Sequence, residues 1–286
     1  MTVKMNLNAF ADEAGSSVEE QLAALRRNGL QGVELRGVDG ENVSDITVQK
    51  AREVYRRFSD AGLKIWSIGS PLGKIEMGKD PFEPHLDKLR HTLELADALS
   101  CRQIRMFSFY IPSGRGPAEY RQEILERLCR MTEISADSGV VLCHENEKGI
   151  YGDTPERCDD LLQNVPGLQA IFDPANFVQC GVDTWAAWQL LGSRIRYLHI
   201  KDALADGNVV PAGQGAGRLG EILGDFIRRG GRDLTLEPHL TVFDGLAGLE
   251  HGEEIKVGKT YSYPNKLAAF DAACAALREL LEKEGD

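Results

Sequence analysis

The sequence has 286 residues, of which 42% are hydrophobic and 27% are charged. This length exceeds that of an ordinary domain but is normal for an eightfold α/β barrel, and the composition is that of a globular protein. The formal net charge of −11 argues against nucleic-acid and anionic-membrane partners, because an acidic surface repels both.

The cysteines and the hydropathy pattern indicate a cytoplasmic protein. The six cysteines are widely spaced and form no C-x-x-C pair, which is typical of reduced thiols in the cytosol. No apolar run reaches about 18 residues, the length expected of a membrane-spanning helix. The first segment, MTVKMNLNAF, alternates like a strand and lacks the apolar core of a signal peptide.

A short apolar run, a loop and an amphipathic segment recur in this order along the chain. The runs predicted as strands are 3–10, 32–36, 64–68, 103–107, 140–145, 170–173, 196–200 and 233–237. The segments predicted as helices are about 17–28, 46–61, 84–99, 117–138, 154–164, 183–191, 219–229 and 264–283. Strands that alternate with helices require parallel strands joined by right-handed crossovers. We therefore predict an α/β fold, a single (β/α)8 TIM barrel domain over residues 1–286, with an open doubly wound sheet as the alternative.

Local signals support several of these boundaries. Ser17 and Glu20 are spaced as a capping box, and Thr154-Pro155 is typical of a helix start. Residues 240–263 form the longest irregular stretch, and a loop of that length is often a functional lid. The glycine-rich segment 213–217 does not directly follow a strand, so we expect a flexible loop beside the barrel mouth and no nucleotide site.

Polar residues stand at the ends of four consecutive predicted strands. They are Glu145, Asp173, His199 and Glu237, each about one strand–helix unit from the next. The carboxyl ends of barrel strands meet at one mouth, so we expect these side chains to be neighbours. Each has an ordinary alternative: Asp173 as a helix cap, His199 as a buried structural residue, and Glu145 as the partner of Lys148. Their joint placement favours a shared site.

Three adjacent carboxylates repel one another, so their charge must be offset. Protonation would do this and would raise a pKa. A bound dication is the better solution, because it satisfies all three carboxylates and also uses the imidazole. We predict one divalent metal at Glu145, Asp173, His199 and Glu237. The oxygen-rich donor set favours Mn²⁺, Mg²⁺ or Co²⁺, and Zn²⁺ is the alternative.

Several stretches of the chain are similar to a known family. The most specific are HENEKGIYGDTPERC (144–158), FDPANFVQCG (172–181), HIKDA (199–203) and LEPHL (236–240). They resemble the sugar phosphate isomerase/epimerase family, the xylose-isomerase-like TIM barrels, and the resemblance extends over almost the whole chain. In that family a Glu, an Asp, a His and a Glu on strands five to eight bind one divalent metal. The matching positions here are the same four residues, Glu145, Asp173, His199 and Glu237.

The resemblance also implies a reaction. It indicates an enzyme that isomerises or epimerises a sugar or keto-sugar through a metal-stabilised enediolate. In the epimerases of the family, the two metal-bound glutamates exchange protons with opposite faces of the substrate. The resemblance assigns those catalytic roles to Glu145 and Glu237 in this sequence. The implied partner is a small carbohydrate substrate, and the oligomeric state, including a homo-oligomer, stays open.

Three inward-pointing residues are predicted to bind substrate. Glu34 and Arg36 flank Leu35 and therefore share one face of the second strand. Two charges are better placed toward the mouth than under the outer helices, either as a mutual ion pair or in contact with substrate hydroxyls. Lys201 shares the inward face with His199 and is a third candidate.

Two departures from the family pattern affect the choice of reaction. Asn176 stands where the epimerases often carry a substrate-binding His, and His239 follows Pro238 where those enzymes tend to lack a His. We expect Asn176 and His239 to contact substrate. A base at His239 would favour a lyase or hydro-lyase acting on a keto-sugar or keto-glycoside. A non-catalytic sugar-binding barrel is the third hypothesis, and the intact quartet argues against it.

Overall fold

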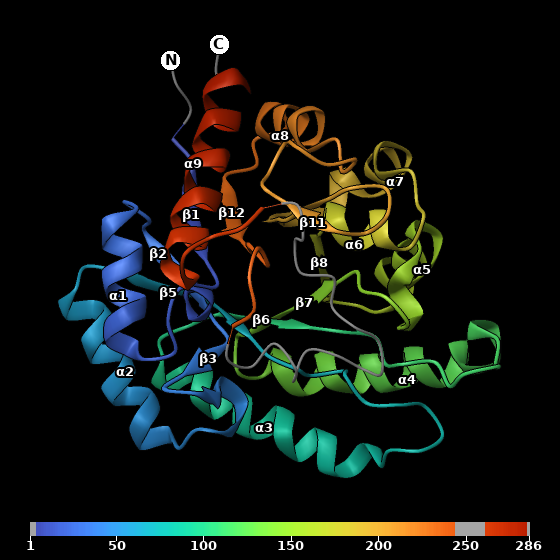
Figure 1. Ribbon diagram of the computed structural model, residues 1–286. Coiled ribbons are helices and arrows are strands. Elements are labelled where there is room, and N and C mark those ends of the chain that lie inside the picture. Colours follow the sequence, from blue (N-terminus) through green and yellow to red (C-terminus); the bar gives the residue numbers. More distant parts are fainter. Residues whose placement is uncertain (1–3, 244–260, 285–286) are drawn as a thin grey trace.

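A closed parallel barrel is the centre of the molecule. The computed structural model describes residues 4–243 and 261–284, and Figure 1 shows the helices arranged around the strands. The barrel strands are β1 (Asn6–Ala9), β2 (Gly32–Leu35), β5 (Lys64–Gly69), β6 (Gln103–Met106), β7 (Val141–Glu145), β8 (Gln169–Phe172), β9 (Ile195–Ile200) and β12 (Asp233–Leu236). Their order around the barrel is β1-β12-β9-β8-β7-β6-β5-β2. Each predicted strand overlaps one of them, so the predicted TIM barrel is confirmed.

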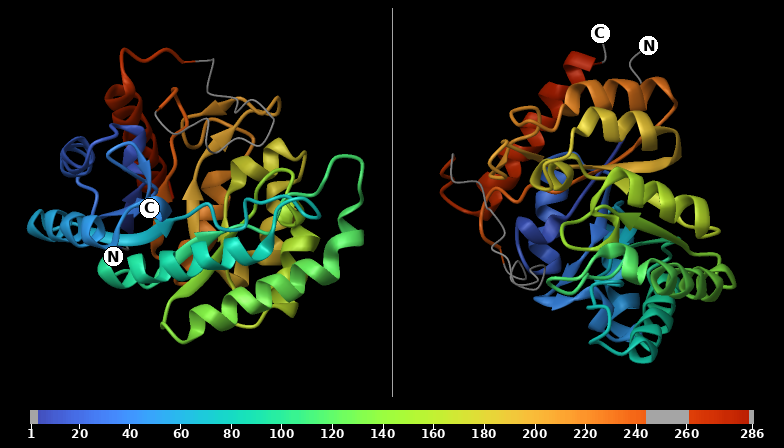
Figure 2. Two further views of the ribbon diagram at one scale, coloured as in Figure 1. Left: turned by 90° about the horizontal axis from the view of Figure 1, so that it is seen from below. Right: turned by 90° about the vertical axis from the view of Figure 1, so that its right-hand side faces the viewer.

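The helices between the strands form the outer layer. They are α1 (Val18–Arg27), α2 (Val48–Asp60), α3 (Phe82–Ala98), α4 (Pro117–Ala136), α5 (Pro155–Asn164), α7 (Thr184–Leu191), α8 (Leu219–Arg228) and α9 (Lys266–Glu284). Both views of Figure 2 show α3 and α4 side by side. The predicted helix starts are confirmed, because Ser17 and Glu20 form a capping box and the Thr154 side chain accepts the backbone N–H of Arg157. Residues 244–260, most of the predicted lid, lie outside the described residues.

Some short elements were not predicted. They are helix α6 (Pro174–Gln179), the 3-10 turn η1 (Ala11–Glu13), the hairpin of β3 (Gly37–Val38) with β4 (Glu41–Asn42), and the hairpin of β10 (Asp202–Ala203) with β11 (Val209–Val210). Two-residue strands are too short to show a periodic hydrophobic pattern. These elements are built from the loops between barrel strands and helices.

Strand alternation separates an apolar outer face from a polar interior. Along β2, Val33 and Leu35 belong to the large hydrophobic core, whereas Glu34 points to the barrel interior. The same alternation places Tyr197 and His199 of β9 on the inner face. Successive strand residues point to opposite sides, so the helices cover one set and the other set builds the site.

The glycine-rich segment 213–217 encloses a carboxylate. The backbone N–H groups of Gly213, Gly215 and Gly217 donate to Asp202 at 3.0, 2.9 and 3.0 Å, and that of Ala203 donates at 3.0 Å. A Cβ at Gly215 would lie 2.2 Å from an Asp202 oxygen. The glycines therefore allow the backbone to approach this buried anion closely. The expected flexible loop is instead held to Asp202 by three backbone hydrogen bonds.

Two further expectations concern the thiols and the membrane. All six cysteines lie in the described residues and are free, as their spacing predicted. None of the helices in the described part of the chain combines the length and hydrophobicity that a bilayer crossing requires.

Candidate metal centre

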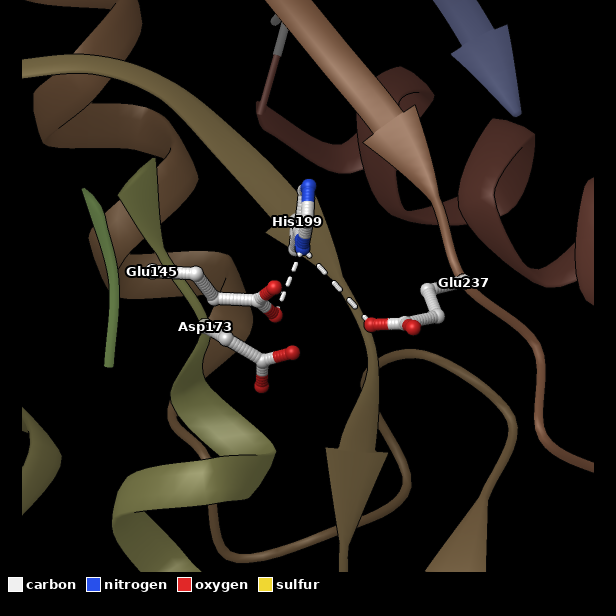
Figure 3. A group of neighbouring side chains, drawn as sticks. All are labelled: Glu145, Asp173, His199 and Glu237. Atoms are coloured by element: carbon white, nitrogen blue, oxygen red, sulfur yellow. Dashed lines mark hydrogen bonds and ion pairs between the residues drawn. The ribbon is translucent and has the colours of Figure 1, made fainter. Parts of the chain in front are cut away.

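The four predicted metal ligands converge at the mouth of the barrel. Glu145 ends β7, Asp173 follows β8, His199 lies in β9, and Glu237 follows β12. One ligand atom from each lies within 4.8 Å of the others, and none of the four residues is more than 2% exposed. Figure 3 shows their side chains directed at a common point. The expected convergence of these four side chains is confirmed.

Asp173 caps a helix and also faces the centre. Its Oδ1 accepts the backbone N–H of Asn176 at 2.9 Å and so begins α6, with Pro174 in the first turn. Its Oδ2 lies 2.9 Å from Nζ of Lys201, on the side of the other ligands. The helix-capping alternative and the site role are therefore compatible, because the two oxygens serve different partners.

Buried cations offset part of the negative charge. Lys201 Nζ lies 2.9 Å from Asp173 Oδ2 and 2.9 Å from Glu237 Oε2, and Arg105 Nη1 lies 3.2 Å from Glu145 Oε2. Burial would lower the pKa of Lys201, but Asp173 and Glu237 outweigh it and raise the pKa well above its usual value. Lys201 is thus a firmly charged ammonium between two of the ligand carboxylates.

The titration properties of the ligands fit a bound dication. Burial raises the pKa of Asp173 to about 7, despite the opposing attraction of Lys201. Burial would also raise the pKa of Glu145, but His199 and Arg105 lower it to about 2. His199 and Arg105 therefore compensate the charge of Glu145, whereas Lys201 compensates the charge of Asp173 only in part. Three carboxylates and one imidazole at this spacing can hold a hard or borderline dication, which would supply the missing charge.

Arg36 does not pair with Glu34. Its guanidinium contacts Asp12 at 2.9 Å, Glu13 at 3.0 Å and Glu237 at 3.1 Å. The hypothesis of a mutual Glu34–Arg36 ion pair is therefore wrong, although both side chains do point inward. Arg36 instead forms an ion pair with one carboxylate oxygen of Glu237, and it also contacts Asp12 and Glu13, the two acids of η1.

Glu34 lies beneath the centre and not at its open side. Its carboxylate faces Nε2 of His199 at 3.2 Å, and its other oxygen accepts the hydroxyl of Tyr197 at 3.0 Å. The side chain has no exposed surface. The His199 ring lies between Glu34 on one side and Glu145 and Glu237 on the other. The expected contact between Glu34 and substrate hydroxyls therefore has no support in this geometry.

His239 lies directly beside Glu237. Its Nε2 is 3.5 Å from Glu237 Oε1 and 3.5 Å from Glu13 Oε1, and it makes no hydrogen bond within residues 4–243 and 261–284. The ring stacks on Phe243 with a centroid distance of 5.5 Å. Burial holds the pKa of His239 well below its usual value. A neutral imidazole whose Nε2 has no hydrogen-bond partner among the described residues therefore stands next to the candidate ligands.

The side chains of Asn176 and His144 form hydrogen bonds with other groups of the protein. The Asn176 side chain donates to the backbone oxygen of Asn146 at 2.8 Å and lies 3.4 Å from Glu145 Oε1. His144 Nε2 lies 2.9 Å from the hydroxyl of Ser108, and burial lowers the pKa of His144 to about 4. Asn176 thus borders the centre, whereas His144 points away from it.

Sequence reasoning missed Arg105, Asp12 and Glu13. Arg105 is a charged residue inside the apolar run QIRMF, and a charge in such a strand signals an inward-facing partner. Asp12 and Glu13 belong to the FADEA segment directly after β1. Burial raises the pKa of Glu13 to about 8 although Arg36 opposes the shift. Together with Arg36 and Lys201, these three residues form the charged surroundings of the predicted ligands.

Comparison with known proteins identifies the family of this barrel. The sequence profile of the xylose isomerase-like TIM barrel family matches residues 22–250. This chain belongs to that family. Other members of this xylose isomerase-like group are named as enzymes, and a 3-dehydroshikimate dehydratase of Bacillus anthracis is 25% identical over 177 residues. That match covers 61% of this chain and 62% of the dehydratase, so it spans less than two thirds of the relative's length.

Solved structures share the xylose isomerase-like fold along almost the whole chain. The probable 3-DHS dehydratase AsbF of Bacillus anthracis has a TM-score of 0.71 at 21% identity and covers 96% of this chain and 99% of its own. An L-ribulose 3-epimerase has a TM-score of 0.74 at 18% identity, covering 99% and 96%. A xylose isomerase-like barrel from Mycobacterium smegmatis, solved with magnesium, has a TM-score of 0.70 at 14% identity, covering 100% and 98%.

Replacing Asp173 with asparagine is expected to reduce the metal content of the protein. Asparagine keeps an oxygen that can cap α6 but loses the charge that attracts a dication. Elemental analysis of protein purified without chelator should find about one divalent ion per wild-type chain and clearly less in the variant. Asp183→Asn is the matched control, because Asp183 caps α7 in the same way. Equal metal in all three proteins would contradict the site.

Proposed function

We propose that this protein is a divalent-metal-dependent isomerase or epimerase of a sugar or keto-sugar. One observation carries the proposal: Glu145 and Glu237 approach the centre from opposite sides, as Figure 3 shows, and an arginine braces each of them. Arg105 contacts Oε2 of Glu145, and Arg36 contacts Oε1 of Glu237. Two buried, ionised carboxylates on either side of one centre can act as a base and, once one of them is protonated, as an acid.

The proposed chemistry is proton transfer at a carbon next to a carbonyl. A dication held by the four ligands would polarise the substrate carbonyl and stabilise the enediolate. Glu145 removes the proton from the α carbon on one face. Glu237, after it takes up a proton from solvent, delivers that proton to the other face, and Glu145 releases its own proton to solvent to restore the resting state. The pKa of Glu145 is lowered to about 2, because His199 and Arg105 outweigh burial, and the pKa of Glu237 also lies well below its usual value, chiefly because Lys201 outweighs burial. Both glutamates are therefore ionised in the free protein, so either can act as the base, and its partner has to take up a solvent proton before it acts as the acid.

A lyase is the second candidate, and His239 favours it. Its Nε2 lies 3.5 Å from Glu237 and has no hydrogen-bond partner among the described residues. A neutral imidazole there can accept the α proton and, as the imidazolium, return it to the leaving hydroxyl, which departs as water. An epimerase needs no such group. The sequence similarity to a 3-dehydroshikimate dehydratase also supports this reaction class. Both reactions begin with removal of an α proton.

An exchange experiment in D₂O separates the candidates. The Mn²⁺-loaded protein would be incubated with a panel of ketohexoses and with 3-dehydroshikimate, followed by removal of the metal and NMR analysis. An isomerase or epimerase yields deuterium at the α carbon and an isomeric product. A lyase yields loss of the α proton coupled to elimination of water and a product that absorbs in the ultraviolet. A metal-loaded protein that gives neither exchange nor elimination with any compound would count against both enzymes and favour a sugar-binding barrel.

A further inference from the structure

We propose that Glu34 is a positioning residue that fixes the His199 ring and leaves Nδ1 as the metal-binding nitrogen. The proposal rests on the metal site of the proposed function and deepens it. Glu34 Oε2 lies 3.2 Å from Nε2 of His199, whereas Nδ1 lies 2.9 Å from Glu145 Oε1 and 3.6 Å from Glu237 Oε2. The two ring nitrogens therefore face different partners, and only Nδ1 faces the other three ligands.

The Glu34 carboxylate is itself held in place. Oε1 accepts the hydroxyl of Tyr197 at 3.0 Å and lies 3.3 Å from the hydroxyl of Ser67. Glu34, Ser67 and Tyr197 come from β2, β5 and β9, and all three have no exposed surface. Since both carboxylate oxygens already have partners inside the barrel, Glu34 is directed at the histidine and has no free oxygen for substrate.

The histidine ring has little freedom to turn. Its centroid lies 5.3 Å from that of Phe10 with an interplanar angle of 84°, and 5.5 Å from that of Tyr197 with an angle of 61°. Edge-on aromatic contacts on two sides restrict the ring, and the hydrogen bond to Glu34 then chooses which nitrogen carries the proton. A metal binds the deprotonated nitrogen, so a carboxylate that keeps the proton on Nε2 prepares Nδ1 as a ligand.

If Glu34 positions His199 for metal binding, its removal should lower the affinity of the protein for a metal. Replacing a residue that orients a metal ligand typically weakens metal binding roughly 10–100-fold. We expect Glu34→Ala to weaken Mn²⁺ binding by that factor and Glu34→Gln to weaken it less, because the amide oxygen can still accept the Nε2 proton. Glu83→Ala is the control, since it removes a glutamate that pairs with Arg130 in the outer helix layer and leaves the Glu34–His199 contact intact. It should bind Mn²⁺ nearly as tightly as the wild type.

The tautomer provides a second measurement that does not depend on any Glu34 variant. The protein labelled with ¹⁵N at histidine and loaded with Zn²⁺ would be studied by long-range ¹H–¹⁵N correlation NMR, with His199→Gln to assign the signal. We expect a proton on Nε2 of His199 and a metal-shifted Nδ1. Circular dichroism would verify that each variant is folded.

The outcomes distinguish this inference from the proposed function. A protein that binds metal through Nε2 of His199 overturns the inference, and so do folded Glu34 variants that bind Mn²⁺ as tightly as the wild type. In either of those cases the D₂O exchange experiment still decides the proposed function separately. A wild-type protein that binds no divalent ion overturns both.

Discussion

Glu237→Gln is expected to lower turnover by roughly 10²–10⁴-fold, the usual cost of losing one general acid–base group. Glutamine keeps the size of the side chain and one ligand oxygen, but it cannot exchange a proton at neutral pH. The turnover of Glu145→Gln should be lowered by a similar factor for the same reason. Steady-state rates would be measured on metal-saturated enzyme, with metal content determined on the same samples, so that lost chemistry is separated from lost metal.

The double variant gives a sharper test of the pair. If both glutamates act in one proton-transfer sequence, the loss in the double variant should be far smaller than the product of the two single losses. Glu147→Gln is the control, because Glu147 lies in the loop after β7 and its carboxylate is 3.5 Å from Lys74. The turnover of Glu147→Gln should be lowered much less than that of Glu145→Gln or Glu237→Gln. Near-normal turnover of metal-loaded Glu237→Gln would contradict the paired-glutamate mechanism and move the base to His239, which favours the lyase.

Lys201→Met is expected to destabilise the protein strongly in the presence of EDTA. Lys201 is 5% exposed and contacts Asp173 and Glu237, so its removal leaves two buried carboxylates without their shared cation. Removing one partner of a buried ion pair typically costs about 3–5 kcal/mol in the free energy of unfolding. Urea denaturation of the EDTA-treated variant and wild type would measure this difference.

Saturating Mg²⁺ or Mn²⁺ should restore much of that loss. A dication that binds only the folded state stabilises it, and in the variant the ion no longer shares the carboxylates with an ammonium. The control is Lys88→Met, because Lys88 forms a partly exposed salt bridge with Asp45 at 2.9 Å. Such a pair contributes only about 0–1 kcal/mol. If the two lysine variants lose equal stability, or metal restores neither, Lys201 does not hold the ligand carboxylates.

The barrel and the convergence of its four candidate ligands were predictable because their signals are local and repeated. Each apolar run and each amphipathic segment is long enough to show its period, and their alternation leaves few topologies. Once the strands are ordered, the position of Glu145, Asp173, His199 and Glu237 at strand ends implies that they meet. No contact between distant side chains has to be known for that inference.

The partners of the charged residues were decided only by the tertiary structure. The sequence places Glu34 and Arg36 two positions apart, yet Glu34 contacts His199 of β9 and Arg36 contacts Glu237 after β12. Arg105 on β6 reaches Glu145 in the same way. Closure of the barrel brings inward side chains of distant strands within hydrogen-bond distance. Which of them meet depends on strand register and tilt, which the hydrophobic period does not encode. The sequence alone therefore determines the fold and the convergence of the four candidate ligands, whereas barrel closure determines which groups hold those side chains in place.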